Sequence, residues 1–155
     1  MRVTLIAVGK LSRAPEGTLA LDYIARAAAG GRALGLAPIE LIEVEARKPG
    51  KEAVGEAILA ALPEGCHLIA CDEHGDQLTS RRLSEKVAAL RDGGEKKLCF
   101  VIGGADGLSP AVLAAARSKL AFGTLTWPHA LARAMLAEQI YRSVTLLAGS
   151  PYHRD

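Results

Sequence analysis

A glycine-rich turn at residues 103–107 is the first stretch of the chain that could take part in chemistry. It follows an unbroken apolar run, Leu98–Ile102, and has the sequence Gly-Gly-Ala-Asp-Gly. Glycines let a ligand approach the main chain closely, so such a turn indicates a binding site, although a turn without a ligand is an equal alternative. The G-x-G-x-x-G spacing of dinucleotide folds and the Gly-Lys-Ser/Thr of a P-loop are both missing, so the turn does not predict a phosphate cradle.

The end of the chain carries a second group of reactive side chains, because Tyr152, His153 and Arg154 are consecutive. An aromatic ring can stack on a base, an imidazole can move a proton near neutral pH, and a guanidinium can bind a phosphate. The alternative is an ordinary disordered tail.

Hydrolytic and metal chemistry are not predicted. The chain has no G-x-S-x-G motif, and Ser109 before Pro110 is better explained as the cap of a helix. Its four histidines lack helical metal spacing, and its three cysteines lack C-x-x-C spacing, so we expect buried thiols and no metal.

Strand-like and helix-like segments alternate five times along the chain. This order predicts an α/β fold with a mainly parallel sheet flanked by helices. No linker or repeat interrupts it, so we expect residues 1–155 to form a single domain. The expected strands are 2–8, 39–44, 67–71, 98–102 and 122–125, and the expected helices are 18–29, 51–62, 79–91, 110–119 and 130–147.

The predicted sheet also predicts where a ligand should bind. Ligands of open parallel sheets lie beyond the carboxyl ends of the strands. Three loops at these ends carry the glycine, proline and polar residues of a binding site, namely 71–75, 103–107 and 125–129. We therefore expect one site built by the last three strands together.

Composition narrows the possible partners. Half of the residues are hydrophobic, yet no apolar run approaches the roughly 18 residues that cross a bilayer, and the first residues do not form a signal peptide. We expect a cytoplasmic protein without a membrane partner. The net charge of +2 neither requires nor excludes nucleic acid, but three cations within Arg47–Lys51 form either a solvated turn or a phosphate contact. The broad apolar stripe of helix 130–147 predicts a partner chain.

Four motifs in order along the chain carry a resemblance to a known family: Ile102–Pro110, Leu125–His129, Ala137–Arg142 and Pro151–Arg154. Together with the chain length, they closely resemble the ribosomal large-subunit pseudouridine N3-methyltransferase family of the SPOUT class. The resemblance implies a trefoil knot in the C-terminal half, S-adenosylmethionine as cofactor and a homodimer. It also implies that the substrate is a pseudouridine of 23S rRNA, methylated at N3 within assembled ribosomes.

The same resemblance implies roles for individual residues. For such a methyl transfer His153 is the candidate base, Arg142 would stabilise the developing anion or a phosphate, and Tyr152 would stack on or orient the flipped base. Arg154, Lys48 and Lys51 would bind the RNA. Where many relatives carry leucine this chain has Cys71, a change that a main-chain contact tolerates. The residues implied to contact the cofactor are Cys71, Gly103, Gly104, Gly123, Thr124, Leu125, Thr126, Trp127 and Pro128.

Two other interpretations remain open at this point. One is a non-catalytic RNA-binding or ribosome-associated α/β module, and the other is a small nucleotide-binding domain. Binding of S-adenosylmethionine distinguishes the methyltransferase from both.

Overall fold

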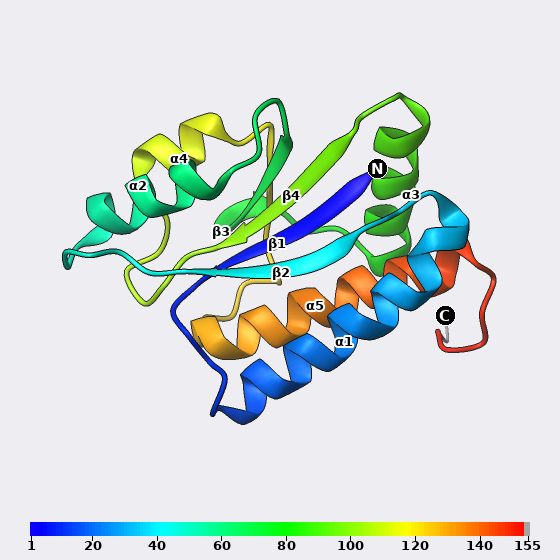
Figure 1. Cartoon of the computed structure of the whole chain (residues 1–155), viewed down its shortest axis with the longest axis horizontal. Coiled ribbons are helices and arrows are strands. Elements are labelled where there is room, and N and C mark those ends of the chain that lie inside the picture. The colour runs from blue at the N-terminus through cyan, green and yellow to red at the C-terminus, as the bar shows by residue number, and fades with distance from the viewer. Residues whose placement is uncertain (154–155) are drawn as a thin grey trace.

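The computed structural model describes residues 1–153 and confirms the predicted α/β class (Figure 1). Its strands are β1 (Arg2–Val8), β2 (Ile39–Val44), β3 (His67–Asp76), β4 (Lys97–Ile102) and β5 (Ser118–Leu120). Its helices are α1 (Pro15–Gly31), the 3-10 turn η1 (Arg32–Leu34), α2 (Lys51–Ala61), α3 (Ser80–Asp92), α4 (Pro110–Ala115) and α5 (His129–Leu147). The strands form one sheet in the order β2-β1-β4-β3-β5, and every neighbouring pair is parallel.

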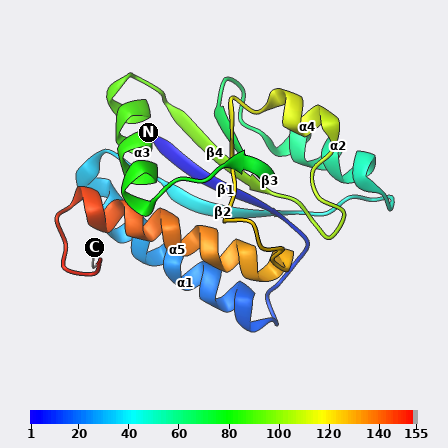
Figure 2. The same cartoon turned by 180° about the vertical axis from the view of Figure 1, so that it is seen from behind.

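Helices cover both faces of this sheet. Helices α2 and α4 lie on one face, and α1, α3 and α5 lie on the other (Figures 1 and 2). Alternate residues of β4 enter two separate hydrophobic cores: Phe100 packs toward α1, α3 and α5, whereas Val101 packs toward α2 and α4. Because each side chain of β4 is buried on one face or the other, its sequence is an unbroken apolar run rather than an alternating one.

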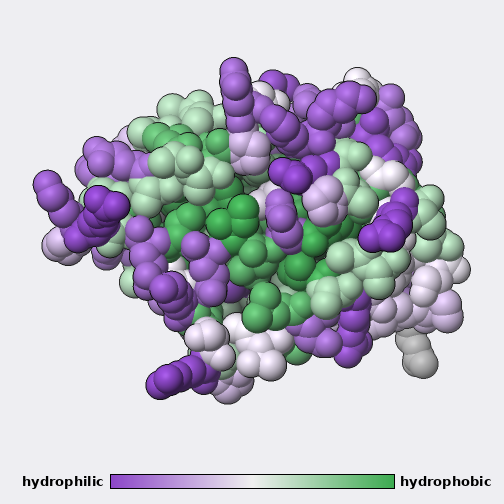
Figure 3. Space-filling view, in the orientation of Figure 1, coloured by the Kyte–Doolittle hydropathy of each residue, from purple (hydrophilic) through white to green (hydrophobic). Residues whose placement is uncertain are grey.

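Strand β2 forms one edge of the sheet and is partly exposed to solvent, as its two glutamates predict. Leu41 and Ile42 are only half-buried there. Seen in the orientation of Figure 1, the molecule has hydrophobic surface over its middle and hydrophilic side chains around it (Figure 3). Strand β4 lies at the centre of the sheet, so the glycine turn that follows it is surrounded by other strand ends.

Two predicted boundaries in the C-terminal half were wrong. The fifth strand is Ser118–Leu120 rather than 122–125, and α4 ends at Ala115 rather than at residue 119. Strand β5 pairs with β3, with Ser118 opposite Ile69. As a short strand at the sheet edge, it buries only Leu120 and carries no apolar run that sequence could reveal.

The predicted helix caps are confirmed. The hydroxyl of Ser109 accepts a hydrogen bond from the Val112 amide at 3.4 Å, and that of Thr79 accepts one from the Arg82 amide at 3.2 Å. The knot implied by the family resemblance depends on threading rather than on strand order, and it stays a prediction. No helix within residues 1–153 has the length and apolar character needed to cross a membrane.

Candidate functional site

A cavity of about 490 Å³ lies beyond the carboxyl ends of β3 and β4. The three loops that sequence predicted as a binding site all contribute to its wall: the segment after Cys71, the glycine turn after Ile102, and the segment from Leu120 to His129 that leads into α5. Lys51, the first residue of α2, lies at the same cavity. A cavity of this size is typical for a small-molecule cofactor.

The glycine turn forms one wall, and its glycines have different roles. The turn closes through a 3.0 Å hydrogen bond from the Gly107 amide to the Gly104 carbonyl. A Cβ on Gly103 would lie 2.7 Å from the main-chain carbon of Gly107, so the turn itself excludes a side chain there. A Cβ on Gly104 would meet only the Val8 side chain, at 3.4 Å. The missing side chain of Gly104 therefore leaves room in the cavity without being required by the fold.

The segment before α5 forms the facing wall. The indole of Trp127 donates a 3.1 Å hydrogen bond to the Phe122 carbonyl, which holds the two ends of this segment together. Within residues 1–153, the amides of residues 123–127 donate no main-chain hydrogen bond. Four of these five residues line the cavity, so it combines glycine-lined space with main-chain amides that lack a main-chain partner among the described residues.

Most of the residues predicted to contact a cofactor are brought together here. Thr124 and Pro128 belong to the same segment but do not line the cavity. Burial raises the pKa of the Cys71 thiol from 9.0 to about 12, so this side chain is a neutral wall residue rather than a nucleophile. The predicted residues that do line the cavity are Cys71, Gly103, Gly104, Gly123, Leu125, Thr126 and Trp127.

The cavity also has polar residues that sequence reasoning did not single out. Asp72 accepts a 2.9 Å hydrogen bond from the amide of His74, and both residues lie at the wall together with His129, the first residue of α5. Asp72 and His74 belong to β3, which continues to Asp76 rather than ending at the predicted residue 71, and their positions beyond the predicted strand were the available signal. None of the described His, Cys, Asp and Glu residues form a group of three that could hold a metal ion.

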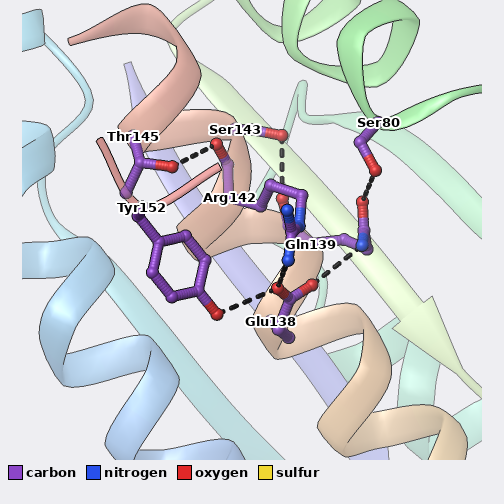
Figure 4. Close-up of polar contacts among 7 residues, drawn as sticks. All are labelled: Ser80, Glu138, Gln139, Arg142, Ser143, Thr145 and Tyr152. Atoms are coloured by element: carbon purple, nitrogen blue, oxygen red, sulfur yellow. Dashed lines mark hydrogen bonds and ion pairs between the residues drawn. The ribbon is translucent and has the colours of Figure 1, made fainter. Parts of the chain in front are cut away.

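Two of the predicted catalytic residues, Tyr152 of the tail and Arg142 of α5, meet at Glu138 on α5 (Figure 4). The phenol of Tyr152 donates a 3.1 Å hydrogen bond to Glu138 Oε1, and Arg142 donates to the same oxygen at 2.6 and 2.9 Å. The Tyr152 ring lies 4.6 Å from that of Tyr141 and beneath the Arg142 guanidinium, whose carbon is 5.1 Å from the ring centroid. The tail is thereby folded back on its own helix.

This environment raises the pKa of both Tyr152 and Arg142. Burial, followed by hydrogen bonds with Tyr23 and Glu138, raises the pKa of the Tyr152 phenol well above 10.0. The hydrogen bond with Glu138 raises the pKa of Arg142. Tyr152 is therefore neutral and Arg142 charged under ordinary conditions. The side chain of His153 is half-buried, and its Nδ1 is buried without a hydrogen-bond partner among the described residues.

The tail and the cavity lie apart within one chain. Arg142 follows His129 by thirteen residues of continuous helix, which is about 20 Å along the axis. The tail accordingly leaves α5 at the end of the helix that is far from the loops of the cavity (Figure 1). Of the predicted RNA-binding residues, Lys51 lies at the cavity and Lys48 is exposed nearby in sequence, whereas Arg154 lies outside the described residues.

A second hollow of about 670 Å³ separates these two regions. We call it the helix groove: α1, α3 and α5 line it together with segment 120–123, which it shares with the first cavity. Leu19 and Leu131 in the groove are 45% and 38% exposed, a large exposure for such side chains. Glu138 also lines the groove, so the docked tail lies at its border.

One buried charge was missed by the sequence analysis. Arg133, on α5, is 2% exposed and forms an ion pair of 2.7 Å with Glu43 of β2. A single arginine on a helix predicts a solvated side chain, and Glu43 lies ninety residues away in sequence, so no local pattern indicated the pair.

The fold is that of an α/β protein with a cavity beyond the carboxyl ends of its parallel strands. The chain belongs to the SPOUT methyltransferase family, because the family model described as "Predicted SPOUT methyltransferase" matches residues 1–153. It is similar over its whole length to proteins named "Ribosomal RNA large subunit methyltransferase H". That of Caulobacter sp. (strain K31) is 61% identical over 155 residues, covering 100% of both chains.

Two further relatives carry the same name. The protein of Caulobacter vibrioides is 59% identical over 155 residues, covering 100% of this chain and 99% of its own. The protein of Hyphomonas neptunium is 50% identical over 154 residues and is matched over 99% of both chains. The similarity therefore includes the strands, the three loops and the tail alike.

Proposed function

We propose that this protein is an S-adenosylmethionine-dependent methyltransferase that methylates N3 of a pseudouridine in 23S rRNA, on assembled ribosomes in the cytoplasm. The observation that carries the proposal is the three-loop cavity, in a chain that matches relatives named as large-subunit rRNA methyltransferases from end to end. The alternative of a non-catalytic RNA-binding module is less favoured, because it gives no reason for a glycine-lined cavity with unpaired amides.

The cavity suits the proposed cofactor. Its volume of about 490 Å³ lies within the usual range for small-molecule sites, and its donors are main-chain amides held by the 120–129 segment. Gly103 and Gly104 would let the cofactor lie close to the main chain, while the neutral Cys71 adds no charge to the wall. When bound, S-adenosylmethionine supplies an electrophilic methyl group. The residues we assign to holding it are Cys71, Gly103, Gly104 and Gly123–Pro128.

The tail residues are assigned to the RNA substrate. The N3 imide of pseudouridine is a poor nucleophile until its proton leaves, so the site needs a base and a group that stabilises the resulting anion. We assign proton removal to His153 and anion stabilisation to Arg142, with Tyr152 orienting the flipped base. Tyr152 and Arg142 share Glu138 as an acceptor, and His153 directly follows Tyr152 in the chain, which supports this assignment.

We infer that these residues act in the site of a second subunit. Within one chain they lie on the far part of α5 from the cavity. The exposed leucines of the helix groove favour a homodimer that covers this groove, and Glu138 places the tail at its border. Seven extended residues reach at most about 25 Å, so a tail that leaves α5 at this border can enter a partner's cavity.

RNA contacts are assigned to cations beside the cavity. Lys48 is exposed and Lys51 lies at the cavity wall, in a loop that also carries Arg47. These side chains can bind phosphates that flank the methylated base, and we assign Arg154 of the tail to the same task. Such contacts position the RNA without reading its sequence, so the fold of the ribosomal RNA would supply the specificity.

The proposal is tested with ribosomes from cells that lack this protein. Purified protein and isotopically labelled S-adenosylmethionine should transfer one methyl group to 23S rRNA, and nuclease digestion with mass spectrometry should place it on N3 of a pseudouridine. Gly104→Val protein is the matched control, because the substitution occupies the cavity and leaves the RNA-binding cations intact. A protein that binds ribosomes without labelling them would instead be a non-catalytic module.

A further inference from the structure

The buried guanidinium of Arg133 joins three segments that are far apart in sequence. From the second turn of α5 it donates to Glu43 Oε2 at 2.7 Å, to the Val8 carbonyl at 2.6 Å and to the Gly9 carbonyl at 2.8 Å. Glu43 Oε2 also accepts a 2.8 Å hydrogen bond from the Leu11 amide. A single side chain thus fixes the end of β1, the end of β2 and the start of α5 relative to one another.

The end of β1 and the start of α5, which Arg133 joins, lie next to the two walls of the cavity. On one side, Ala7 of β1 pairs with Ile102, the residue before the glycine turn, so the end of β1 at Val8 lies beside this turn. On the other side, Ala132, the neighbour of Arg133, lines the cavity, and its amide bonds to the Pro128 carbonyl at 2.9 Å, where the 120–129 segment becomes helix. Arg133 lies between the two walls and contacts the supports of each.

Stability alone does not explain such a pair. Burying a charge costs solvation free energy, and apolar residues of similar volume usually replace a buried ion pair without loss of stability. Arg133 is 2% exposed and Glu43 is 28% exposed at the side chain, and Arg133 Nε is buried without a hydrogen-bond partner among the described residues. The arrangement fixes geometry at an energetic cost, which is typical of groups that support a site.

We propose that Arg133, held by Glu43, is a positioning residue that sets the distance between the glycine turn and the 120–129 segment and thereby the affinity of the cavity for its cofactor. The inference rests on the proposed function for the identity of that cofactor. Arg133 does not enter the reaction: it acts through Val8 on the glycine turn and through the first turn of α5 on the facing wall.

The test uses a double variant, Arg133→Met with Glu43→Leu, which replaces the pair by apolar side chains. The two charges leave together, but the Val8 and Gly9 carbonyls and the Leu11 amide lose their side-chain partners, so its melting temperature should fall while the protein stays folded. Calorimetric titration should show that the affinity for S-adenosylmethionine falls by about tenfold or more, the loss expected when a site is misplaced by a fraction of an ångström. Glu43→Gln is the conservative control: it keeps an acceptor for Arg133 and should bind within about threefold of the wild type.

A second measurement needs no cofactor. Trp127 is the only tryptophan of the chain, is 37% exposed and lies at the cavity wall, so its fluorescence reports on the 120–129 segment. Acrylamide should quench it about twice as strongly in the double variant as in the wild type or in Glu43→Gln, because the start of α5 is no longer fixed to β1.

The outcomes separate the proposals. A double variant that does not fold overturns the positioning role, since the pair would then be required by the fold. Unchanged quenching in a folded double variant also overturns it, whatever happens to the affinity. Increased quenching with unchanged affinity shows that Arg133 fixes the 120–129 segment but does not set the affinity for the cofactor, which overturns that part of the proposal. If the wild type itself binds no S-adenosylmethionine while quenching responds as expected, the proposed function fails, but the positioning of the 120–129 segment by Arg133 is supported.

Discussion

Tyr152 and Glu138 are joined by a 3.1 Å hydrogen bond that folds the C-terminal tail onto α5 of the same chain. The same carboxylate oxygen accepts two hydrogen bonds from Arg142, so two residues of the proposed catalytic group share one acceptor. Glu138 also lines the helix groove. Any partner that covers this groove will therefore meet the side chains that hold the tail.

We predict that Tyr152→Phe loosens the tail. The substitution removes the hydrogen bond to Glu138 while keeping the ring contact with Tyr141, so docking should weaken by about 1 kcal/mol, or roughly fivefold in the population of the open tail. Hydrogen exchange at the Ser150 amide, which bonds to the Thr145 carbonyl at 2.9 Å, should speed up by a similar factor.

Tyr141→Phe is the matched control for this experiment. It also removes a phenolic hydroxyl from α5 beside the tail, but it leaves the Tyr152 to Glu138 bond in place. Unchanged exchange in both variants would show that ring packing, rather than this hydrogen bond, holds the tail.

The raised pKa of Cys71 predicts an unusual pH dependence of alkylation. Burial moves the pKa from 9.0 to about 12, so the thiolate fraction should rise about tenfold per pH unit through pH 8–10 without levelling. An ordinary thiol would level off above pH 9. Iodoacetamide labelling followed by mass spectrometry of the Cys71 peptide measures this, with urea-unfolded protein as the control that levels off. A plateau near pH 9 in the folded protein would show that Cys71 is open to solvent.

Gly104→Val should abolish cofactor binding and leave the fold intact. The Cβ of residue 104 would make only an ordinary contact of 3.4 Å with Val8, so the added atoms occupy the cavity rather than the core. We expect the affinity for S-adenosylmethionine to fall by about a hundredfold or more, with the melting temperature nearly unchanged. Gly103→Val is the contrasting variant: its Cβ would lie 2.7 Å from the main chain of Gly107, so it should lower the melting temperature as well. Tight binding by a folded Gly104→Val protein would move the site elsewhere.

The sequence predicts those parts of the fold and the site that depend on interactions between residues close together in the chain. The apolar run Leu98–Ile102 predicted a central strand, and the alternating Glu40 and Glu43 predicted an edge strand, because burial on two faces or on one leaves a local pattern. The three loops at the strand ends were also predictable, since parallel strands end at one edge of the sheet.

Contacts between distant segments could not be predicted in this way. Strand β5 contains Ser118 and Lys119, and only its pairing with β3 makes it a strand. The ion pair of Arg133 with Glu43 joins α5 to β2, and neither residue differs locally from a surface charge. The position of the tail on Glu138 likewise depends on the path of the chain after α5, which no motif records.

Homodimer formation through the helix groove gives a further prediction. Leu131→Glu places a charge in the groove and should shift the protein from dimer to monomer at micromolar concentration, as measured by light scattering. Leu21→Glu is the control, because Leu21 is also exposed, at 52%, but does not line the groove. A dimer that survives Leu131→Glu uses another surface.

The last prediction concerns the division of labour between two subunits. Removing residues 150–155 deletes the proposed base and leaves both walls of the cavity in place, so methylation of ribosomes should fall by at least about a hundredfold, the usual effect of losing general base catalysis. S-adenosylmethionine affinity and melting temperature should stay close to those of the full chain. The single variant His153→Ala should lose activity to a similar extent with Tyr152 still docked, which separates loss of the base from loss of the tail.

Mixing the two kinds of defective chain then decides whether the tail acts within one chain or across the dimer. In a heterodimer of a tail-deleted chain and a Gly104→Val chain, one subunit has an intact cavity and the other an intact tail. If the tail serves the partner, each heterodimer has one competent site, and an equal mixture should recover about a quarter of the wild-type activity, since half of the dimers are mixed and each of these has one site of two. If the tail serves its own cavity, no combination is complete, and the mixture should stay as inactive as its components. Activity should also vanish when Leu131→Glu is added to both chains, because the repair requires the dimer.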